Sequence, residues 1–119
     1  MSNKSIDVFF HKKYNKDTYN CAHFASEVWE YLCNESISKN LGSLLLPFNQ
    51  RTTDISLRHS FKKLKEPESP CIVLMQRRRC NAHVGVYVRG KVLHIQEHGV
   101  EFLPLNLVAI GFDKIGFYK

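Results

Sequence analysis

The most regular pattern of apolar residues lies in the segment YNCAHFASEVWEYLC, residues 19–33. In a helix, its apolar side chains would share one stripe: Cys21, Phe24, Ala25, Val28, Trp29 and Leu32. Asn20 precedes this stripe, and an asparagine side chain there can accept a first-turn N–H that has no backbone partner. The pattern therefore predicts a helix over residues 21–33 with Asn20 as its N-cap.

The next thirty residues are less regular. Residues 34–53 contain Gly42, Pro47 and several polar residues, which is typical of a connecting loop. Residues 54–65, DISLRHSFKKLK, have loosely periodic apolar positions and predict a second amphipathic helix. The segment EPESP then interrupts the chain.

Short apolar runs dominate the second half of the chain. CIVLMQ reads as a strand, and HVGVYV and KVLHIQ, separated by Arg89-Gly90, predict a β-hairpin. GVEFLPL, VAIGF and KIGFYK read as further short strands. A helical front half followed by an antiparallel sheet predicts an α+β fold.

Composition narrows the class of protein. The 119 residues, 44% of them hydrophobic, fit a single globular domain over residues 1–119. The apolar runs are too short to span a bilayer, and the first residues have no signal-peptide pattern. Four irregularly spaced cysteines favour synthesis in a reducing cytoplasm without a signal peptide. The net charge of +6 favours an anionic partner: a nucleic acid, a cell-wall polymer or a membrane surface.

Cys21 lies at a position that favours a reactive thiol. The first turn of a helix carries partial positive charge and unpaired N–H groups, which stabilise a thiolate and could bind an oxyanion. A nucleophile also needs a base and a group that orients the base. If Arg89-Gly90 is a two-residue turn, His83 faces Gln96, and His94 is its diagonal neighbour on the same face.

This register predicts a Cys–His–His relay. His83 would be the general base and acid, and His94 would fix its tautomer. A register slip of one residue would move His94 to the other face of the sheet. In that case Gln96 or Glu97 would be the orienting group.

These segments resemble a known family. NCAHFASEVW is similar to the nucleophile segment of NlpC-like, papain-fold cysteine peptidases, and HVGVYVRGKVLHI resembles their histidine signature. The order of cysteine, histidine and second polar residue is that of the unpermuted family. GFYK resembles the end of short members found in bacteriophage tails. The resemblance covers residues 14–119.

The resemblance implies a papain-like α+β fold, with Cys21 as nucleophile, His83 as base and His94 as orienting residue, and no cofactor. Tyr14, or else Tyr19, would help the first-turn amides, including that of Ala22, to line the oxyanion site, and Gln96 is a further candidate for substrate contact.

The substrate implied is a peptide or amide bond in peptidoglycan stem peptides. The protein would act at the host cell wall or be carried by a virion, with phage tail proteins as further partners. Three positions depart from the family pattern: Asn20 replaces an acidic residue, His23 a small residue, and Pro70-Cys71 a Gly-Asp pair.

Other readings of these residues stay open. Cys21, His23, Cys80 and His83 could form a zinc site, although Cys-x-His spacing is unusual for one. The basic segments QRRRC and KKLK could bind nucleic acid, but short basic runs are usually solvated. The fold could also persist as a catalytically silent structural or binding module of a phage tail. Cys33, Cys71 and Cys80 are expected to be packing residues.

Overall fold

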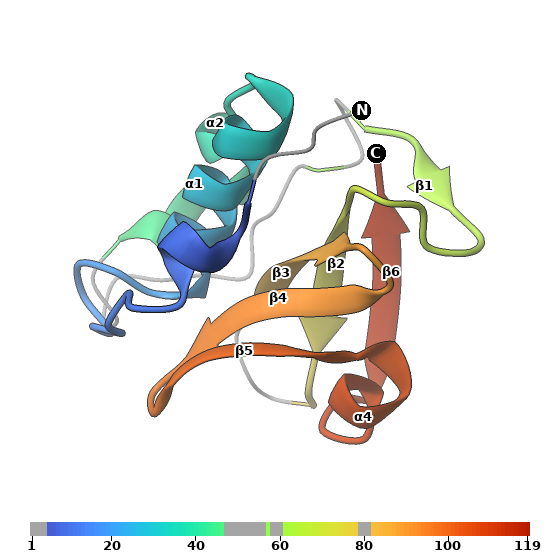
Figure 1. Ribbon diagram of the computed structural model, residues 1–119. Helices are drawn as coiled ribbons and strands as arrows, with labels where there is room; N and C mark the ends of the chain where they lie inside the picture. Colours follow the sequence, from blue (N-terminus) through green and yellow to red (C-terminus); the bar gives the residue numbers. More distant parts are fainter. Residues whose placement is uncertain (1–4, 47–56, 58–60, 79–81) are drawn as a thin grey trace.

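Six strands form one antiparallel sheet in the computed structural model, which describes residues 5–46, 57, 61–78 and 82–119. The strand order is β1-β6-β2-β3-β4-β5, so the last strand of the chain lies between the first two. The strands are β1 (Lys63–Leu64), β2 (Cys71–Gln76), β3 (His83–Val88), β4 (Lys91–Gln96), β5 (Gly99–Pro104) and β6 (Lys114–Tyr118). Figure 1 shows the sheet beside the helical layer.

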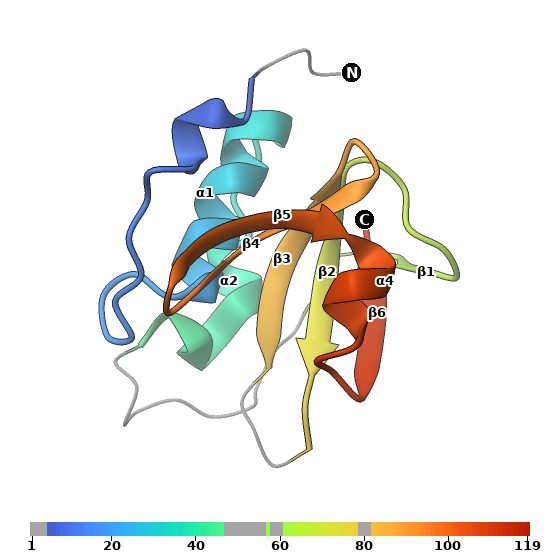
Figure 2. The same ribbon diagram turned by 60° about the horizontal axis from the view of Figure 1, so that its bottom comes forward.

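The long helix α1 (Cys21–Cys33) packs against β3 and β4. Its stripe of apolar side chains is buried as the sequence predicts, and Asn20 caps its first turn. The helix ends at Asn34, whose positive φ of 55° gives the left-handed residue that often closes a helix. In Figures 1 and 2, α1 begins at the end of the sheet where β3 begins and β4 ends.

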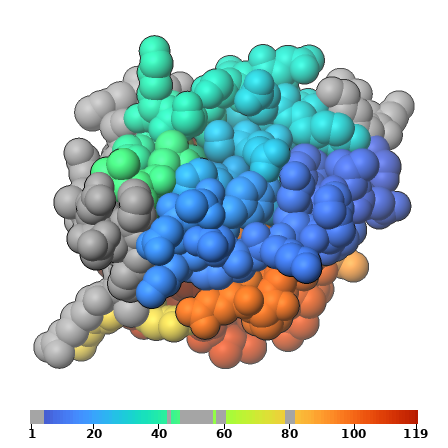
Figure 3. Space-filling view, turned by 90° about the vertical axis from the view of Figure 1, so that its left-hand side faces the viewer, coloured from blue at the N-terminus to red at the C-terminus, as the bar shows by residue number. Residues whose placement is uncertain are grey.

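Short helices complete the two faces of the sheet. The elements η1 (Asp7–Phe9), α2 (Ser38–Leu41) and η2 (Gly42–Leu45) lie with α1, and Figure 3 shows the amino-terminal segment and these helices covering that side. On the opposite face, α4 (Leu105–Ala109) contributes Val108 to a second cluster with Val73, Met75 and Val92. The sheet therefore separates a large core under α1 from a smaller one under α4.

Several predicted elements are confirmed. The helix over 21–33, the strand CIVLMQ and the hairpin across Arg89-Gly90 are all present, and GVEFLP and KIGFY form β5 and β6. The hairpin pairs Val88 with Lys91, so its two-residue turn is as predicted. Arg89 adopts a φ of 54° and Gly90 one of 86°, the left-handed backbone that such turns require.

Two predictions were wrong, and a third holds only in part. Residues 34–53 were expected to be a loop, but α2 and η2 lie there; residues 47–53 are outside the described part. The predicted helix over 54–65 holds in part: Leu57 is helical and its carbonyl accepts from the Phe61 N–H at 2.9 Å. Lys63 and Leu64, in contrast, form β1, because their pairing with β6 overrides the weak helical periodicity. Of this segment only Leu57 and residues 61–65 are described. The predicted strand VAIGF is mostly α4 and the turn after it, because Val108 is buried from a helix.

The α+β class is confirmed by one long helix packed on an antiparallel sheet. Across the described ranges, no helix has the length and apolar character needed to cross a bilayer.

Candidate functional site

Cys21 is the first residue of α1, and only 8% of its surface is exposed. It belongs to the large buried cluster together with Ala82, Val84 and Ile95. These residues flank the two predicted histidines along β3 and β4, so the thiol lies in the layer between α1 and the strands that carry them.

Asn20 and His23 form the cap that fixes Cys21. The Asn20 side chain accepts the Ala22 N–H through Oδ1 at 2.8 Å and donates through Nδ2 to the Leu44 carbonyl at 2.8 Å. In return, Asn20 N–H donates to His23 Nδ1 at 3.1 Å, which completes a capping box. Asn20 and His23, two of the three departures from the family pattern, thus form one structural unit. The Ala22 N–H donates to Asn20.

His83 and His94 are in direct contact. His83 Nε2 lies 2.7 Å from His94 Nδ1, with the rings at 78° to each other. Gly85 makes this possible, because a Cβ at that position would lie 3.0 Å from His94 Cβ. The residues on β3 and β4 predicted to form a pair therefore do so, in the register set by the hairpin turn.

Glu101 extends the pair to a third residue that the sequence reasoning missed. It stands opposite His94 in the β4–β5 ladder, and its Oε1 lies 3.1 Å from His94 Nε2. Within the described residues, His94 Nε2 is buried and has no other hydrogen-bond partner, so the Glu101 carboxylate is the acceptor that it faces. Counting outward from a two-residue turn at Glu97-His98, just before Gly99, would have identified this pairing.

This arrangement fixes the tautomers of both histidines. A carboxylate can only accept, so His94 Nε2 carries the proton that faces Glu101. His94 Nδ1 then accepts from the His83 Nε2–H. The remaining nitrogen, His83 Nδ1, is left with a lone pair, as a general base needs.

Both imidazoles are held neutral. Burial lowers the pKa of His83, and the charges of His94 and Arg77 lower it further. Burial also lowers the pKa of His94, although Glu101 partly offsets this effect. The pKa of Glu101 is lowered as well: burial raises it, but hydrogen bonds from His98 and Gln96 and the nearby histidine charges outweigh burial. Near neutral pH the cluster is two neutral imidazoles and one carboxylate.

Cys21 and the His83 ring pack against different apolar clusters. The His83 ring stacks on Phe112, a member of the smaller cluster, with centroids 5.5 Å apart and planes at 8°. Cys21 packs in the larger cluster on the α1 side. The His83 side chain is hydrogen-bonded to His94.

Tyr19 and Tyr14, the two tyrosines predicted for the oxyanion site, have different surroundings. The Tyr19 hydroxyl donates to Glu27 Oε1, two turns along the outer side of α1, and its ring stacks on His23. Burial first, and then Glu27, raise the pKa of Tyr19. Tyr14 is half-buried against the large core.

Gln96 and Glu97, the alternatives to His94, have other surroundings. Gln96 Nε2 donates to Glu101 Oε1 at 2.9 Å, so Gln96 supports the carboxylate rather than His83. Glu97 is exposed in the turn between β4 and β5. Of the three candidates, His94 is the one whose side chain contacts His83.

The other cysteines have no described role in the site. Burial raises the pKa of Cys71 to about 11 and also raises that of Cys33. Cys80, needed for the zinc alternative, lies outside the described residues. In the ranges that are described, no three His, Cys, Asp or Glu side chains are grouped so as to hold a metal ion.

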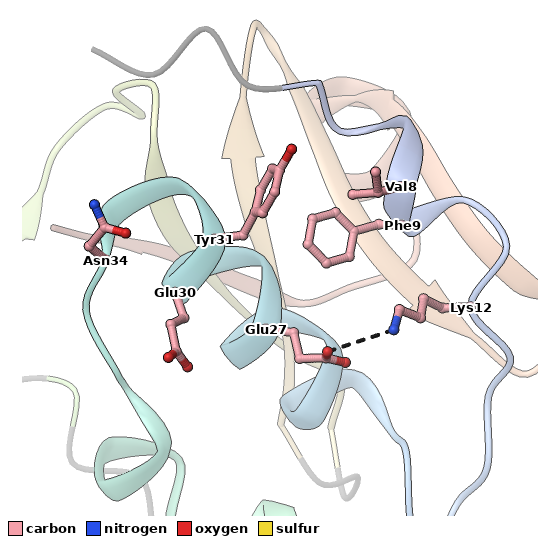
Figure 4. A pocket seen from close by; sticks show the side chains of 7 residues that line it. All are labelled: Val8, Phe9, Lys12, Glu27, Glu30, Tyr31 and Asn34. Carbon is pink, nitrogen blue, oxygen red and sulfur yellow. Dashed lines mark ion pairs between the residues drawn. The ribbon is translucent and has the colours of Figure 1, made fainter.

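A shallow hollow lies on the outer side of α1, away from these residues. Figure 4 shows it between η1 and α1, with Lys12 paired to Glu27 across 3.7 Å at one side. Its lining has neither a cysteine nor a histidine, so it adds nothing to a thiol–imidazole site.

Comparisons of the chain with protein-family models, with curated proteins and with solved structures gave no match.

Proposed function

We propose that the protein is a cysteine hydrolase in which Cys21 attacks a peptide or amide carbonyl and His83 moves the proton. The observation that carries the proposal is the 2.7 Å contact between His83 Nε2 and His94 Nδ1, aligned by Glu101. A chain of two histidines and a carboxylate has little purpose in a stable core, because burying three ionisable groups costs free energy. Its use is to present one basic nitrogen, His83 Nδ1, in a fixed direction.

The reaction would proceed in two steps. His83 Nδ1 takes the proton of the Cys21 thiol as sulfur bonds to the carbonyl carbon, and then gives it to the leaving amine, so that an acyl-enzyme forms. Water, deprotonated by the same nitrogen, then displaces the thiolate and releases the acid. His94 keeps the His83 ring in position through both steps.

The resemblance to NlpC-like peptidases narrows the proposed substrate to peptidoglycan stem peptides. A net charge of +6 would favour binding to an anionic wall polymer. The papain-like version of the α+β fold and a place in a phage particle or at a host wall belong to the same proposal.

The first experiment is the pH dependence of Cys21 alkylation by iodoacetamide, followed by peptide mapping. Cys33 and Cys71 should react more slowly, because burial raises the pKa of both thiols. In the wild type the midpoint for Cys21 should lie well below the ordinary value of about 8.5. The variant His83→Ala should move it back up, while the control His11→Ala, which removes an exposed histidine, should not.

A specific observation favours a second candidate, a catalytically silent module that binds without cleaving. Cys21 is largely buried, with 8% of its surface exposed, and this burial limits the access of a substrate to the thiol. If Cys21 reacts like an ordinary thiol in both the wild type and His83→Ala, the hydrolase proposal is wrong. Binding to insoluble cell wall that survives Cys21→Ala would then support the silent module.

A further inference from the structure

Glu101 joins a buried histidine to an exposed one through a single carboxylate. Its Oε1 lies 3.1 Å from Nε2 of His94, whose side chain is 1% exposed. Its Oε2 lies 2.8 Å from Nε2 of His98, whose side chain is 66% exposed. The Glu101 side chain is 24% exposed, so it lies at the boundary between the surface and the histidine pair that contains the proposed base.

The turn between β4 and β5 produces this arrangement. Gln96 pairs with Gly99, so His98 is the second residue of a two-residue turn. His98 precedes Glu101 by three residues, and its ring contacts the carboxylate oxygen that His94 does not face. Gln96 donates to the other oxygen, Oε1, at 2.9 Å. Both carboxylate oxygens are therefore engaged, and a change at one of them alters what the other offers its partners.

Protonation of His98 would change the electrostatic support that Glu101 gives to His94. A carboxylate can only accept, so His98 donates through Nε2 whether its ring is neutral or charged, and the contact persists. The charged ring, however, offsets much of the negative charge of the carboxylate. Burial lowers the pKa of His94, Glu101 raises it, and the charge of His98 lowers it again. Because His94 accepts from His83, a weaker acceptor at His94 makes His83 a weaker base.

His98 is the member of this cluster whose charge can follow the pH of the surroundings. Among the described residues, the titratable groups that act on Glu101 are His98 and His94. Burial disfavours the charged form of both His94 and His83. Arg77 also acts on His83, but an arginine keeps its charge at every relevant pH. An exposed imidazole, in contrast, is the side chain that ordinarily gains or loses its charge between pH 5 and 8.

We propose that His98 is a positioning residue that makes the strength of the base depend on pH. When His98 is neutral, the full charge of Glu101 supports His94 and, through it, His83. When His98 is charged, this support weakens and Cys21 loses its proton less readily. The effect on Cys21 rests on the proposed hydrolase function, whereas the coupling between His98 and His94 does not depend on it.

The coupling is measured first, by nitrogen NMR of the imidazoles as the pH is lowered from 8 to 5. In the wild type, the ring nitrogens of His94 should shift with the same midpoint as those of His98. His98→Gln keeps a donor at this position without a titrating charge, so this shift of His94 should be lost. The control His11→Gln removes another exposed histidine and should keep it. A His94 signal that stays constant while His98 titrates, or a shift that persists in His98→Gln, would overturn the inference.

The effect on the base is measured at Cys21 by the rate of iodoacetamide alkylation, followed by peptide mapping. The rate for His98→Gln relative to wild type should be close to one at pH 8 and should rise up to about fivefold at pH 5.5, the range for one solvent-exposed charge pair. His98→Lys carries its charge at both pH values and should react more slowly than His98→Gln at both.

The two measurements separate this inference from the hydrolase proposal. A relative rate that does not change with pH, at a Cys21 that still depends on His83, would overturn the control of the base by His98 and leave the hydrolase proposal standing. If Cys21 reacts like an ordinary thiol in every variant, the hydrolase proposal is wrong, and the NMR shift of His94 still decides whether His98 is coupled to the buried pair.

Discussion

Replacing Gly85 with alanine tests how closely β3 and β4 hold the two histidines. The new Cβ would lie 3.0 Å from His94 Cβ, 3.0 Å from the Leu93 carbonyl oxygen and 3.2 Å from Val92 Cγ1. Ordinary carbon contacts are about 3.5–4.0 Å. The Leu93 oxygen cannot rotate away because it belongs to the backbone of a paired strand.

The expected cost follows from two opposing effects. Overpacking in a tight core costs about 1–3 kcal/mol. Replacing glycine restricts the unfolded chain and returns about 0.4–1 kcal/mol. We therefore expect Gly85→Ala to lower the free energy of unfolding by about 1–2 kcal/mol. His94 must also move by a few tenths of an ångström, which would weaken its contact with His83.

Urea unfolding followed by fluorescence of Trp29, the single tryptophan, would measure the change. Gly111→Ala is the matched control, because its nearest neighbour would lie at 3.5 Å, an ordinary contact. That variant should stay within about 0.5 kcal/mol of wild type. Equal unfolding midpoints for Gly85→Ala and Gly111→Ala would refute the close packing of His94 on β3.

Three further predictions concern the cap and the histidine cluster. Asn20→Ala should lower the free energy of unfolding by about 1–3 kcal/mol, because the Ala22 N–H and the Leu44 carbonyl both lose a buried partner. Urea unfolding would measure this loss of stability. Glu101→Gln should let His94 populate its other tautomer, which the nitrogen shifts of its imidazole would show, whereas the exposed control Glu97→Gln should change nothing. The free energy of unfolding should fall as the pH drops below about 6.5, by up to about 1.4 kcal/mol per pH unit for each of His83 and His94. The reason is that the pKa of each histidine is lower in the folded protein than in the unfolded chain, so the unfolded chain takes up protons first. Unfolding curves at pH 7.5 and 5.5 that coincide would contradict it.

Prediction from the sequence succeeded for the elements whose structure depends on nearby residues, namely α1 and the β3–β4 hairpin. The stripe of α1 is buried as its spacing requires, and the turn at Arg89-Gly90 set the register that brings His94 to His83. Both features depend on contacts between residues near each other in the chain, so periodicity and turn chemistry were sufficient to predict them.

Prediction failed where long-range pairing decided the structure. Lys63 and Leu64 are strand residues because β6, the last strand of the chain, lies beside them. Nothing local signals this, since the partner is more than fifty residues away. Glu101 was missed for a related reason: its role follows from the β4–β5 register, and its own segment shows only an acidic residue in an apolar strand.

The sequence by itself determined the α1 helix with its thiol at the first turn, the central hairpin and the pairing of the two histidines. Only the tertiary structure decided what surrounds them. It placed Glu101 beside His94, stacked Phe112 on His83, and packed Cys21 into the larger cluster under α1. The physical reason is that a strand's two faces are fixed by alternation along the chain, whereas the neighbours of each face come from segments that only folding brings together.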